Sequence, residues 1–360
     1  MANHRNTYHV AVVGATGAVG TEMMRVLEQR RFPVKEITLL ASERSAGKRL
    51  RFERKTYAVR RLSAEAFDGV DVALFSAGAA RSLEFAPEAV KRGAVVVDNS
   101  SAFRMDPQVP LVIPEVNAEA LKHHRGIIAN PNCSTIVMLV ALKPLHDAAR
   151  IRRIIVTTLQ SVSGAGAKAM YQLVAETGEL VRRLRVQPHS AAARSLVQFD
   201  PHVVTSKKAR VLPAQIAWNV VPQIDQFADE GYTKEEWKMV RETRKILGTP
   251  DLPIVATCVR VPVLVGHSES IAVEFERALS PAEATELLRR APGVRLVDEP
   301  AKGRYPLPID CAGIDETLVG RIRRDLSIAN GLTLWVAGDN LRKGAATNAV
   351  QIAELVVRER

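Results

Sequence analysis

The chain has 360 residues, 47% hydrophobic and 25% charged, which is enough for two domains with substantial cores. No apolar run approaches the roughly 20 residues that a membrane-spanning helix needs, so we expect no membrane partner. The net charge of +11 is compatible with nucleic-acid binding, but basic residues are spread along the chain and aromatic residues make up only 5%. We therefore expect no nucleic-acid partner. The charge then indicates an ordinary basic surface or one that attracts small anions.

The three cysteines, Cys133, Cys258 and Cys311, are widely spaced along the chain. This spacing resembles neither a disulfide framework nor a zinc-binding pattern. The first residues also lack the apolar region of a secretory signal. These features together predict a cytoplasmic protein without a bound metal.

A glycine-rich loop follows the first predicted strand, residues 8–13. Its sequence at residues 14–20 is GATGAVG, with the spacing G-x-x-G-x-x-G, and a helix should follow to about Arg30. Glycines in such a loop allow backbone N–H groups at the helix N-terminus to approach a pyrophosphate. A tight turn without a ligand would also use glycine, but the position after an apolar strand favours dinucleotide binding.

The loop after the second predicted strand, residues 37–40, concerns the choice of cofactor. An NAD enzyme places a carboxylate there for the ribose hydroxyls, and Glu43 could serve. Ser42, Arg44 and Ser45 instead suit the 2′-phosphate of NADP. The sequence therefore predicts NADP rather than NAD, with a solvated turn as the alternative.

The next segments continue an alternation of strands and helices. A strand at 70–75 precedes a helix that runs to Lys91, and another buried strand spans 94–97. This order predicts a Rossmann-like, doubly wound parallel sheet, which binds ligands at the carboxyl ends of its strands. Arg104 follows such an end, although a lone arginine there would more often be an ordinary surface residue.

Cys133 lies in the stretch NPNCST, residues 130–135, where a short strand is expected to turn into a helix. The apolar run 136–142 predicts a buried helix, which Pro144 should kink or end. Free N–H groups and the helix dipole at the first turn favour a thiolate, which suits a nucleophile. Because cysteines are more often buried core residues, this assignment depends on the other motifs.

The second half of the chain has a different pattern. Its predicted strands are longer and more alternating, which favours a mostly antiparallel sheet with one face covered by helices, in an α+β domain. They fall at residues 154–160, 253–262, 270–276, 317–323 and 332–336. We predict a dinucleotide-binding domain at 1–132, a second domain at 133–339, and a C-terminal segment, 340–360, that completes the first domain with a helix over 345–357.

Seven stretches occur in one order from about Val10 to Glu354 and together resemble the bacterial aspartate-β-semialdehyde dehydrogenase family. They are residues 14–20, 100–104 (SSAFR), 130–135, Gln160 with 163–166 (SGAG), 235–238 (EEWK), 258–262 (CVRVP) and 267–270 (HSES). The resemblance covers nearly the whole chain. It implies NADP-dependent reductive dephosphorylation of L-aspartyl-4-phosphate to L-aspartate-4-semialdehyde, in the biosynthesis of lysine, threonine, methionine and diaminopimelate.

The resemblance implies a role for each matching residue. Cys133 would form an acyl-thioester, His267 would be the acid/base residue, and Gln160 would position the acyl group. Arg260 would bind the substrate α-carboxylate and Glu235 its α-ammonium group. A thiolate, an imidazole and a planar guanidinium are each suited to these tasks.

The phosphate and cofactor sites follow from the same resemblance. Arg104 and Lys238 would bind phosphate, although Glu235 and Lys238 could instead be a surface ion pair on one helix. The family is typically a homodimer, with the second domain at the interface. The implied or predicted cofactor contacts are Gly14, Thr16, Gly17, Ala18, Val19, Ser42, Arg44, Ser45, Ser163, Gly164 and Asn340.

Two other functions remain open at this stage. N-acetyl-γ-glutamyl-phosphate reductase would share the architecture and chemistry, but its uncharged substrate amide would not need Glu235. A redox-inactive NADP-binding sensor would bind the cofactor without turnover. Neither Cys311 nor the segment 187–206 receives a function, and we expect that segment near the interface or over the site.

Overall fold

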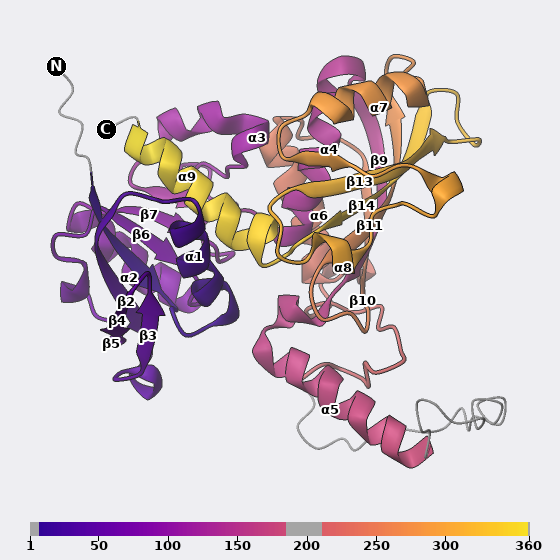
Figure 1. Ribbon diagram of the computed structural model, residues 1–360. Coiled ribbons are helices and arrows are strands. Elements are labelled where there is room, and N and C mark those ends of the chain that lie inside the picture. Colours follow the sequence, from indigo (N-terminus) through magenta and orange to yellow (C-terminus); the bar gives the residue numbers. More distant parts are fainter. Residues whose placement is uncertain (1–6, 185–210, 359–360) are drawn as a thin grey trace.

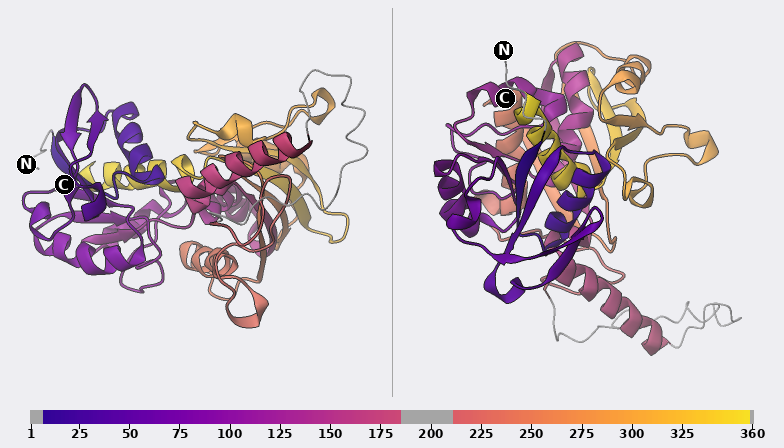
Figure 2. Two further views of the ribbon diagram at one scale, coloured as in Figure 1. Left: turned by 90° about the horizontal axis from the view of Figure 1, so that it is seen from below. Right: turned by 60° about the vertical axis from the view of Figure 1, so that its left-hand side comes forward.

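The computed structural model describes residues 7–184 and 211–358, so the segment 187–206 lies outside the described residues. Two lobes, one for each half of the chain, are joined by the C-terminal helix (Figures 1 and 2). Within the described residues no helix is both long and apolar enough to cross a membrane.

The N-terminal lobe contains a six-stranded sheet in which every pair of neighbours is parallel. Helix α2 (Ala79–Lys91) packs on one face, and α1 (Ala18–Gln29) and α9 (Thr347–Arg358) pack on the other (Figure 1). This arrangement confirms the predicted Rossmann-like sheet. In spatial order the strands are β5 (Arg60–Arg61), β2 (Val34–Ala41), β1 (Tyr8–Val13), β6 (Val72–Phe75), β7 (Val95–Asp98) and β8 (Ile127–Ala129).

Strand β1 is buried on both faces, because its alternate side chains enter two different cores. Val12 packs in the core that contains Leu27 of α1 and Ala353 of α9. Val13 packs in the core that contains Ala86 of α2. A strand covered on both sides reads as a continuous apolar run, which explains why it was predictable. The strands β3 (Arg49–Phe52) and β4 (Lys55–Ala58) form a separate hairpin.

The second lobe contains a six-stranded mixed sheet. Its three central pairs are antiparallel, and one parallel pair lies at each edge. Helices α4 (Cys133–Ala149), α6 (Lys234–Leu247) and α7 (Pro281–Arg290) pack on one face, as predicted (Figure 1). The strands, in order, are β10 (Ile254–Arg260), β9 (Ile151–Gln160), β11 (His267–Phe275), β14 (Gly331–Gly338), β13 (Thr317–Arg324) and β12 (Val294–Leu296).

The part of the chain that the structure describes contains three further α-helices. Helix α5 (Ala167–Leu184) extends away from the second lobe (Figure 1), whereas α3 (Pro114–Asn117) and α8 (Pro308–Cys311) are single turns.

Pro144 was expected to kink or end helix α4. The helix continues through Pro144 to Ala149, so the expectation that it would end there was wrong. A proline inside a helix costs about 3 kcal/mol or more. Leu142 and Leu145, on either side of it, are fully buried in the main core. Burying each such side chain stabilises the helix by about 1.5–3 kcal/mol, and eleven residues of α4 are buried. Packing therefore outweighs the lost backbone hydrogen bond.

The C-terminal helix begins with a π-helical turn, Arg342–Ala346, rather than directly at the predicted residue 345. Within this turn the buried ammonium group of Lys343 donates to Glu115, Asn348 and Gln351. Gly344 lies so close to Cys133 that an added Cβ would be 2.9 Å from the cysteine Cβ. The turn therefore packs the C-terminal segment directly against the start of α4.

Candidate active site

A cavity of about 390 Å³ lies between the two lobes, and residues from both line it. It brings together Cys133, which begins α4, and side chains from the ends of the second sheet and from α6. Eleven of the residues singled out by sequence line this one cavity: Val19, Arg104, Cys133, Gln160, Ser163, Gly164, Glu235, Lys238, Arg260, His267 and Asn340.

Cys133 is the first residue of α4, as predicted. The side chain of Asn132 caps the helix by accepting hydrogen bonds from the backbone N–H groups of Ser134 and Thr135, at 3.0 and 3.3 Å. Burial and the negative charge of Glu235 nevertheless raise the pKa of the Cys133 thiol to about 12. The protonated thiol is therefore favoured in this structure, and the expectation of a thiolate was wrong, because the effect of burial on the pKa exceeds that of the helix terminus.

One ring nitrogen of His267 accepts a hydrogen bond from the protein, and the other lies at the cavity. Its Nδ1 accepts a hydrogen bond from the Ser161 backbone N–H at 3.1 Å, which assigns the ring proton to Nε2. Nε2 has no partner among the described residues. An added Cβ at Gly164 would lie only 3.3 Å from it. Burial, together with the charge of Arg260, lowers the pKa of His267 to about 3, so the ring is a neutral donor.

Arg260 and Gln160 lie opposite each other on neighbouring strands β10 and β9. The Arg260 guanidinium is buried and donates through Nη1 to the carbonyl of Ser161 at 2.7 Å. Its Nε has no partner among the described residues. A buried cation with free donors at a cavity is suited to binding a carboxylate in bidentate geometry.

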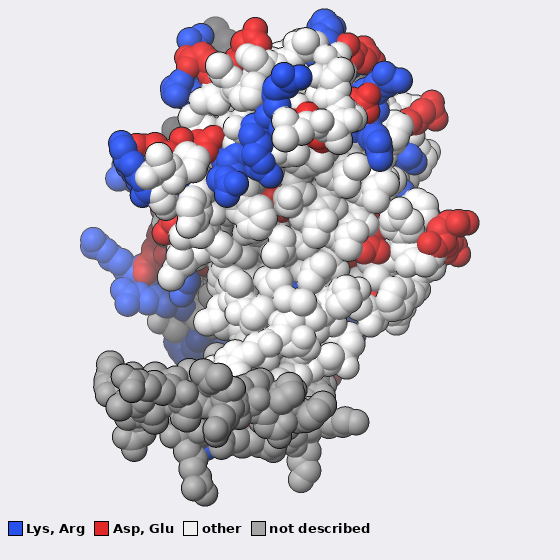
Figure 3. All heavy atoms as spheres, turned by 90° about the vertical axis from the view of Figure 1, so that its right-hand side faces the viewer, with Lys and Arg blue, Asp and Glu red and all other residues white. Residues whose placement is uncertain are grey.

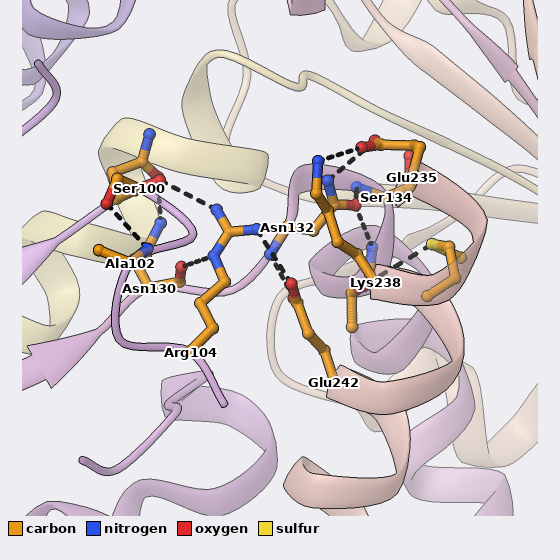
Figure 4. A network of polar contacts seen from close by, with 12 residues as sticks. Ser100, Ala102, Arg104, Asn130, Asn132, Ser134, Glu235, Lys238 and Glu242 are labelled. Carbon is orange, nitrogen blue, oxygen red and sulfur yellow. Dashed lines mark hydrogen bonds and ion pairs between the residues drawn. The ribbon is translucent and has the colours of Figure 1, made fainter. Parts of the chain in front are cut away.

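Glu235, near the start of α6, accepts three side-chain hydrogen bonds. The donors are Gln160 at 3.0 Å, Asn132 at 2.9 Å and Lys238 at 3.0 Å. Figure 4 shows Asn132 and Lys238 beside the carboxylate. Burial alone would raise its pKa, but Lys238 and these hydrogen bonds lower the pKa of Glu235 to about 2. The cavity therefore keeps an ionised carboxylate at any ordinary pH. Lys238 also contacts Asp225 at 3.0 Å.

Arg104 reaches the cavity from the loop after β7. Its Nε donates to the carbonyl of Asn130 and its Nη2 to that of Asn99, each at 2.9 Å. Its Nη1 donates to Glu242 at 3.0 Å (Figure 4). Sequence analysis missed Glu242. Its spacing of seven residues from Glu235 on one helix, which repeats a helical face, could have drawn attention to it.

Asn340 and Ser163 lie together on the cavity wall. The Oδ1 atom of Asn340 accepts hydrogen bonds from the hydroxyl groups of Ser161 and Ser163 and from the backbone N–H of Gly266. This network links the turn after β9 to the turn after β14. It places two of the predicted cofactor contacts beside His267.

The glycine-rich loop forms a cradle where side chains would not fit. Gly14 has φ +86, and an added Cβ would lie 2.3 Å from the carbonyl oxygen of Ser76. An added Cβ at Gly20 would lie 2.2 Å from the Gly14 oxygen. A second cavity, of about 460 Å³, adjoins this loop and is lined by Gly14, Thr16, Gly17 and Ser42 among others. The loop therefore fits the pyrophosphate of a dinucleotide.

Three predicted cofactor contacts, Ala18, Arg44 and Ser45, line neither cavity. The side chain of Arg44 is exposed, whereas that of Ser45 is buried and lies 3.4 Å from the hydroxyl of Thr16. Sequence analysis missed two basic residues that do line the second cavity, Arg61 and Arg81.

The remaining cysteines lie outside both cavities. Cys258 is buried in the main core. Cys311 packs beside Leu318 and donates to the carbonyl of Pro308 at 3.2 Å. Cys311, which had no assignment, is therefore a core residue.

Two family models match the chain. "Semialdehyde dehydrogenase, NAD binding domain" matches residues 9–124, and "Semialdehyde dehydrogenase, dimerisation domain" matches residues 142–343. An aspartate-semialdehyde dehydrogenase of Aquifex aeolicus is 53% identical over 98% of each chain, and one of Bacillus subtilis is 50% identical over 96% of each. The chain belongs to the aspartate-semialdehyde dehydrogenase family.

Solved structures of this family agree with the fold. Aspartate semialdehyde dehydrogenase II of Vibrio cholerae has a TM-score of 0.89 at 48% identity, covering 98% of this chain and 99% of that one. A second structure of the Vibrio enzyme is described as complexed with ASA. The two matched family domains fall on either side of the predicted boundary after residue 132, whose exact position stays a prediction.

Proposed function

We propose that this chain catalyses the NADP-dependent reductive dephosphorylation of L-aspartyl-4-phosphate to L-aspartate-4-semialdehyde through a thioester on Cys133. The observation that carries the proposal is the single cavity holding a helix-capped thiol, a neutral imidazole donor, a buried arginine and a buried ionised carboxylate. Such a set can bind a small amino acid and activate its side-chain acyl group.

The first step uses Cys133 as the nucleophile. The sulfur–carbon bond forms while the carbon–oxygen bond to phosphate breaks, and the thiol proton leaves with the phosphate. The positive charges of Arg104 and Arg260 lower the pKa of the thiol, against the burial that raises it to about 12, and so help to form the thiolate. Arg104 and Lys238 would hold the departing phosphate.

In the second step the thioester carbon accepts a hydride, the chemistry that a nicotinamide dinucleotide held by the glycine-rich loop, Ser163 and Asn340 would supply. The oxygen of that carbon then carries a negative charge. We assign the Nε2–H of His267, which has no partner among the described residues, as the donor to this oxyanion. Breaking the carbon–sulfur bond releases the aldehyde, and the thiolate takes up a proton. Gln160 would orient the acyl group.

Substrate selection would come from Arg260 and Glu235. Arg260 would pair with the α-carboxylate and Glu235 with the α-ammonium group. An ionised, buried Glu235 favours a substrate with a free amine over an N-acetylated one, because an amide could not neutralise its charge. This favours the aspartyl substrate over N-acetyl-γ-glutamyl phosphate.

NADP is the cofactor that we propose, held by the glycine cradle and by Ser42, Arg44 and Ser45. Gly14 and Gly17, which line the second cavity beside the N-terminus of α1, support pyrophosphate binding. Asn340 and Ser163, at the first cavity, would then lie near the nicotinamide end. The preference for NADP over NAD rests on the basic and hydroxyl side chains of the loop after β2.

We also propose that two copies associate through the uncovered face of the second sheet. Figure 3 shows that this side of the second lobe is largely uncharged. Ile155 and Val255 project from its strands and are about 40% exposed (39% and 41%), and Tyr171 and Val174 of α5 are more exposed still. The matched family domain is itself called a dimerisation domain. We place the enzyme in the cytoplasm, in the biosynthesis of lysine, threonine, methionine and diaminopimelate.

The proposal is tested in the reverse direction, with L-aspartate-4-semialdehyde, NADP and inorganic phosphate. We expect NADPH formation that depends on phosphate and is lost in Cys133→Ala, while that variant still binds NADP. N-acetyl-glutamate semialdehyde should react poorly. Turnover of Cys133→Ala within about tenfold of wild type would remove the thioester from the mechanism. Cofactor binding without any turnover would instead support a sensor.

A further inference from the structure

Helix α6 carries four charged side chains along one face, at the spacing of successive helical turns. We call these four residues, Glu235, Lys238, Glu242 and Lys245, the charged stripe of α6. Glu235 and Lys238 line the first cavity, whereas Glu242 and Lys245 lie further along the helix and do not line it. Lys245 donates to the backbone carbonyls of Arg104, Asp106 and Val109. The lower half of the stripe therefore holds the loop that carries Arg104.

Glu242 is the buried centre of this arrangement, with 1% of its surface exposed. One carboxylate oxygen accepts from Nη1 of Arg104 at 3.0 Å, and the other accepts from the backbone N–H of Asn132 at 2.6 Å. Figure 4 shows the carboxylate between these two partners. A single side chain thus connects the loop after β7 to the N-cap of helix α4.

The orientation of Arg104 follows from its contacts. Three of its N–H groups are used by Glu242 and by the carbonyls of Asn130 and Asn99. A guanidinium has further N–H donors in the same plane, and Arg104 lines the cavity. Glu242 therefore determines which edge of the guanidinium remains available to an anion.

We propose that Glu242 is a positioning residue that holds the Arg104 guanidinium and the N-cap of the Cys133 helix at a fixed separation, so that phosphate affinity and thiol reactivity both depend on it. This inference rests on the proposed function, in which Arg104 binds phosphate and Cys133 is the nucleophile.

Glutamine cannot replace Glu242 in this arrangement. Arg104 and the Asn132 backbone are both donors, whereas a glutamine amide offers one accepting oxygen and one donating NH₂ group. With glutamine at this position, either the Arg104 N–H or the Asn132 backbone N–H would face the amide NH₂ group, which is itself a donor. The Glu242→Gln change also leaves the Arg104 guanidinium, whose charge lowers the pKa of the Cys133 thiol, without its buried carboxylate partner, which favours the thiolate.

The test is Glu242→Gln in the full-length enzyme, with two measurements. The KM for phosphate in the reverse reaction should rise about tenfold or more, as expected for a lost charge-assisted contact, while the KM for semialdehyde stays within about twofold. The rate of Cys133 alkylation by iodoacetamide at pH 8, without substrates, should rise at least about threefold, the effect of half a pKa unit.

Glu236→Gln is the matched control. Glu236 neighbours the stripe on the same helix, is 8% exposed and accepts from the backbone N–H groups of Thr233 and Cys258. Like Glu242 it is a buried glutamate that accepts two hydrogen bonds, but it does not contact Arg104 or Asn132. The phosphate KM and the alkylation rate of Glu236→Gln should therefore match those of wild type. An equal effect of Glu236→Gln on both measurements would reduce Glu242 to a general structural residue and overturn the inference.

An unchanged phosphate KM together with an unchanged alkylation rate in Glu242→Gln would also overturn it. Should that variant fail to fold, Glu242→Asp decides. Its shortened carboxylate cannot reach both partners, so a rise of about threefold in the phosphate KM supports the inference and an unchanged KM overturns it. If wild type shows no phosphate-dependent turnover, the proposed function fails, and the alkylation measurement, which needs no turnover, still decides the role of Glu242.

Discussion

The side-chain amide of Gln160 donates to a carboxylate oxygen of Glu235 that also accepts from Asn132, the cap of the helix that begins with Cys133. Glu235 thus connects strand β9 and helix α6 to the first turn of α4. It also brings a permanent negative charge beside the thiol, since its own pKa is lowered to about 2 despite its burial. The residue proposed to bind the substrate amine therefore also restrains the nucleophile.

Glu235→Gln should make Cys133 more reactive before substrate binds. Glu235 is one of the causes of the raised thiol pKa, so removing its charge lowers that pKa and increases the thiolate fraction at pH 8. We expect alkylation by iodoacetamide to accelerate by about threefold or more, measured by mass spectrometry of the intact protein. The same variant should lose turnover. Alkylation as slow as in wild type would show that Glu235 does not hold back the thiol.

The two proposed anion sites should respond separately to substitution. Arg260→Lys keeps a charge but loses the planar pair of donors, so the KM for semialdehyde should rise about tenfold or more and that for phosphate should change little. Lys238→Ala should mainly raise the KM for phosphate. The measurement is the reverse reaction with each substrate varied in turn. Equal weakening of both substrates by Arg260→Lys would contradict this assignment.

The cofactor preference is tested at Arg44. Arg44→Ala should weaken NADPH by about tenfold to a hundredfold, and NADH far less, if its guanidinium binds the 2′-phosphate. Arg61→Ala is the informative comparison, because Arg61 lines the second cavity whereas Arg44 does not. Binding is followed by cofactor fluorescence. If Arg61→Ala lost the preference for NADPH over NADH while Arg44→Ala kept it, Arg61 rather than Arg44 would bind the 2′-phosphate.

Glu269 provides a prediction about stability and pH. It is fully buried on β11, two residues after His267, and neither carboxylate oxygen has a partner among the described residues. Burial raises the pKa of Glu269 well above its ordinary value. The folded state binds the proton of such a carboxyl more tightly than the unfolded chain does. The free energy of unfolding therefore falls as pH rises above about 4.3, the ordinary pKa of a glutamate.

Glu269→Gln should therefore gain free energy of unfolding relative to wild type, and more at pH 8 than at pH 5. We expect a gain of at least about 1 kcal/mol at pH 8, the cost of an unsatisfied buried group. Urea unfolding at the two pH values measures it. Glu119→Gln, at an exposed position, is the control and should behave as wild type. A gain that is the same at both pH values would argue against titration of Glu269.

Much of the fold was predictable because its strands are buried on one or both faces. The apolar run of β1 and the glycine loop after it predicted the dinucleotide half, and the longer strands predicted the second sheet. Cys133 at a helix start was predictable from the NPNCST stretch and the apolar run 136–142 that follows it. The alternation of helices and strands also placed Arg104 at a carboxyl end.

The errors came from energies that depend on packing. Pro144 was expected to kink or end α4, and it does not end the helix because buried leucines on both sides favour its continuation. The helix terminus was expected to favour a Cys133 thiolate, but burial and Glu235 reverse the sign. Glu242 reads in sequence as one more surface charge of α6, and only the fold brings it to Arg104. Local sequence does not encode which distant groups exclude water.

The contact between Gly344 and Cys133 has a consequence for biosynthesis on the ribosome. The nucleophile begins α4, whereas the π-helical turn that packs against it, and α9 that covers the first sheet, come after every strand of the second sheet in the chain. The N-terminal lobe of a nascent chain therefore lacks one of its covering helices until the second lobe has been synthesised. We expect the surroundings of Cys133 to be completed only after that point.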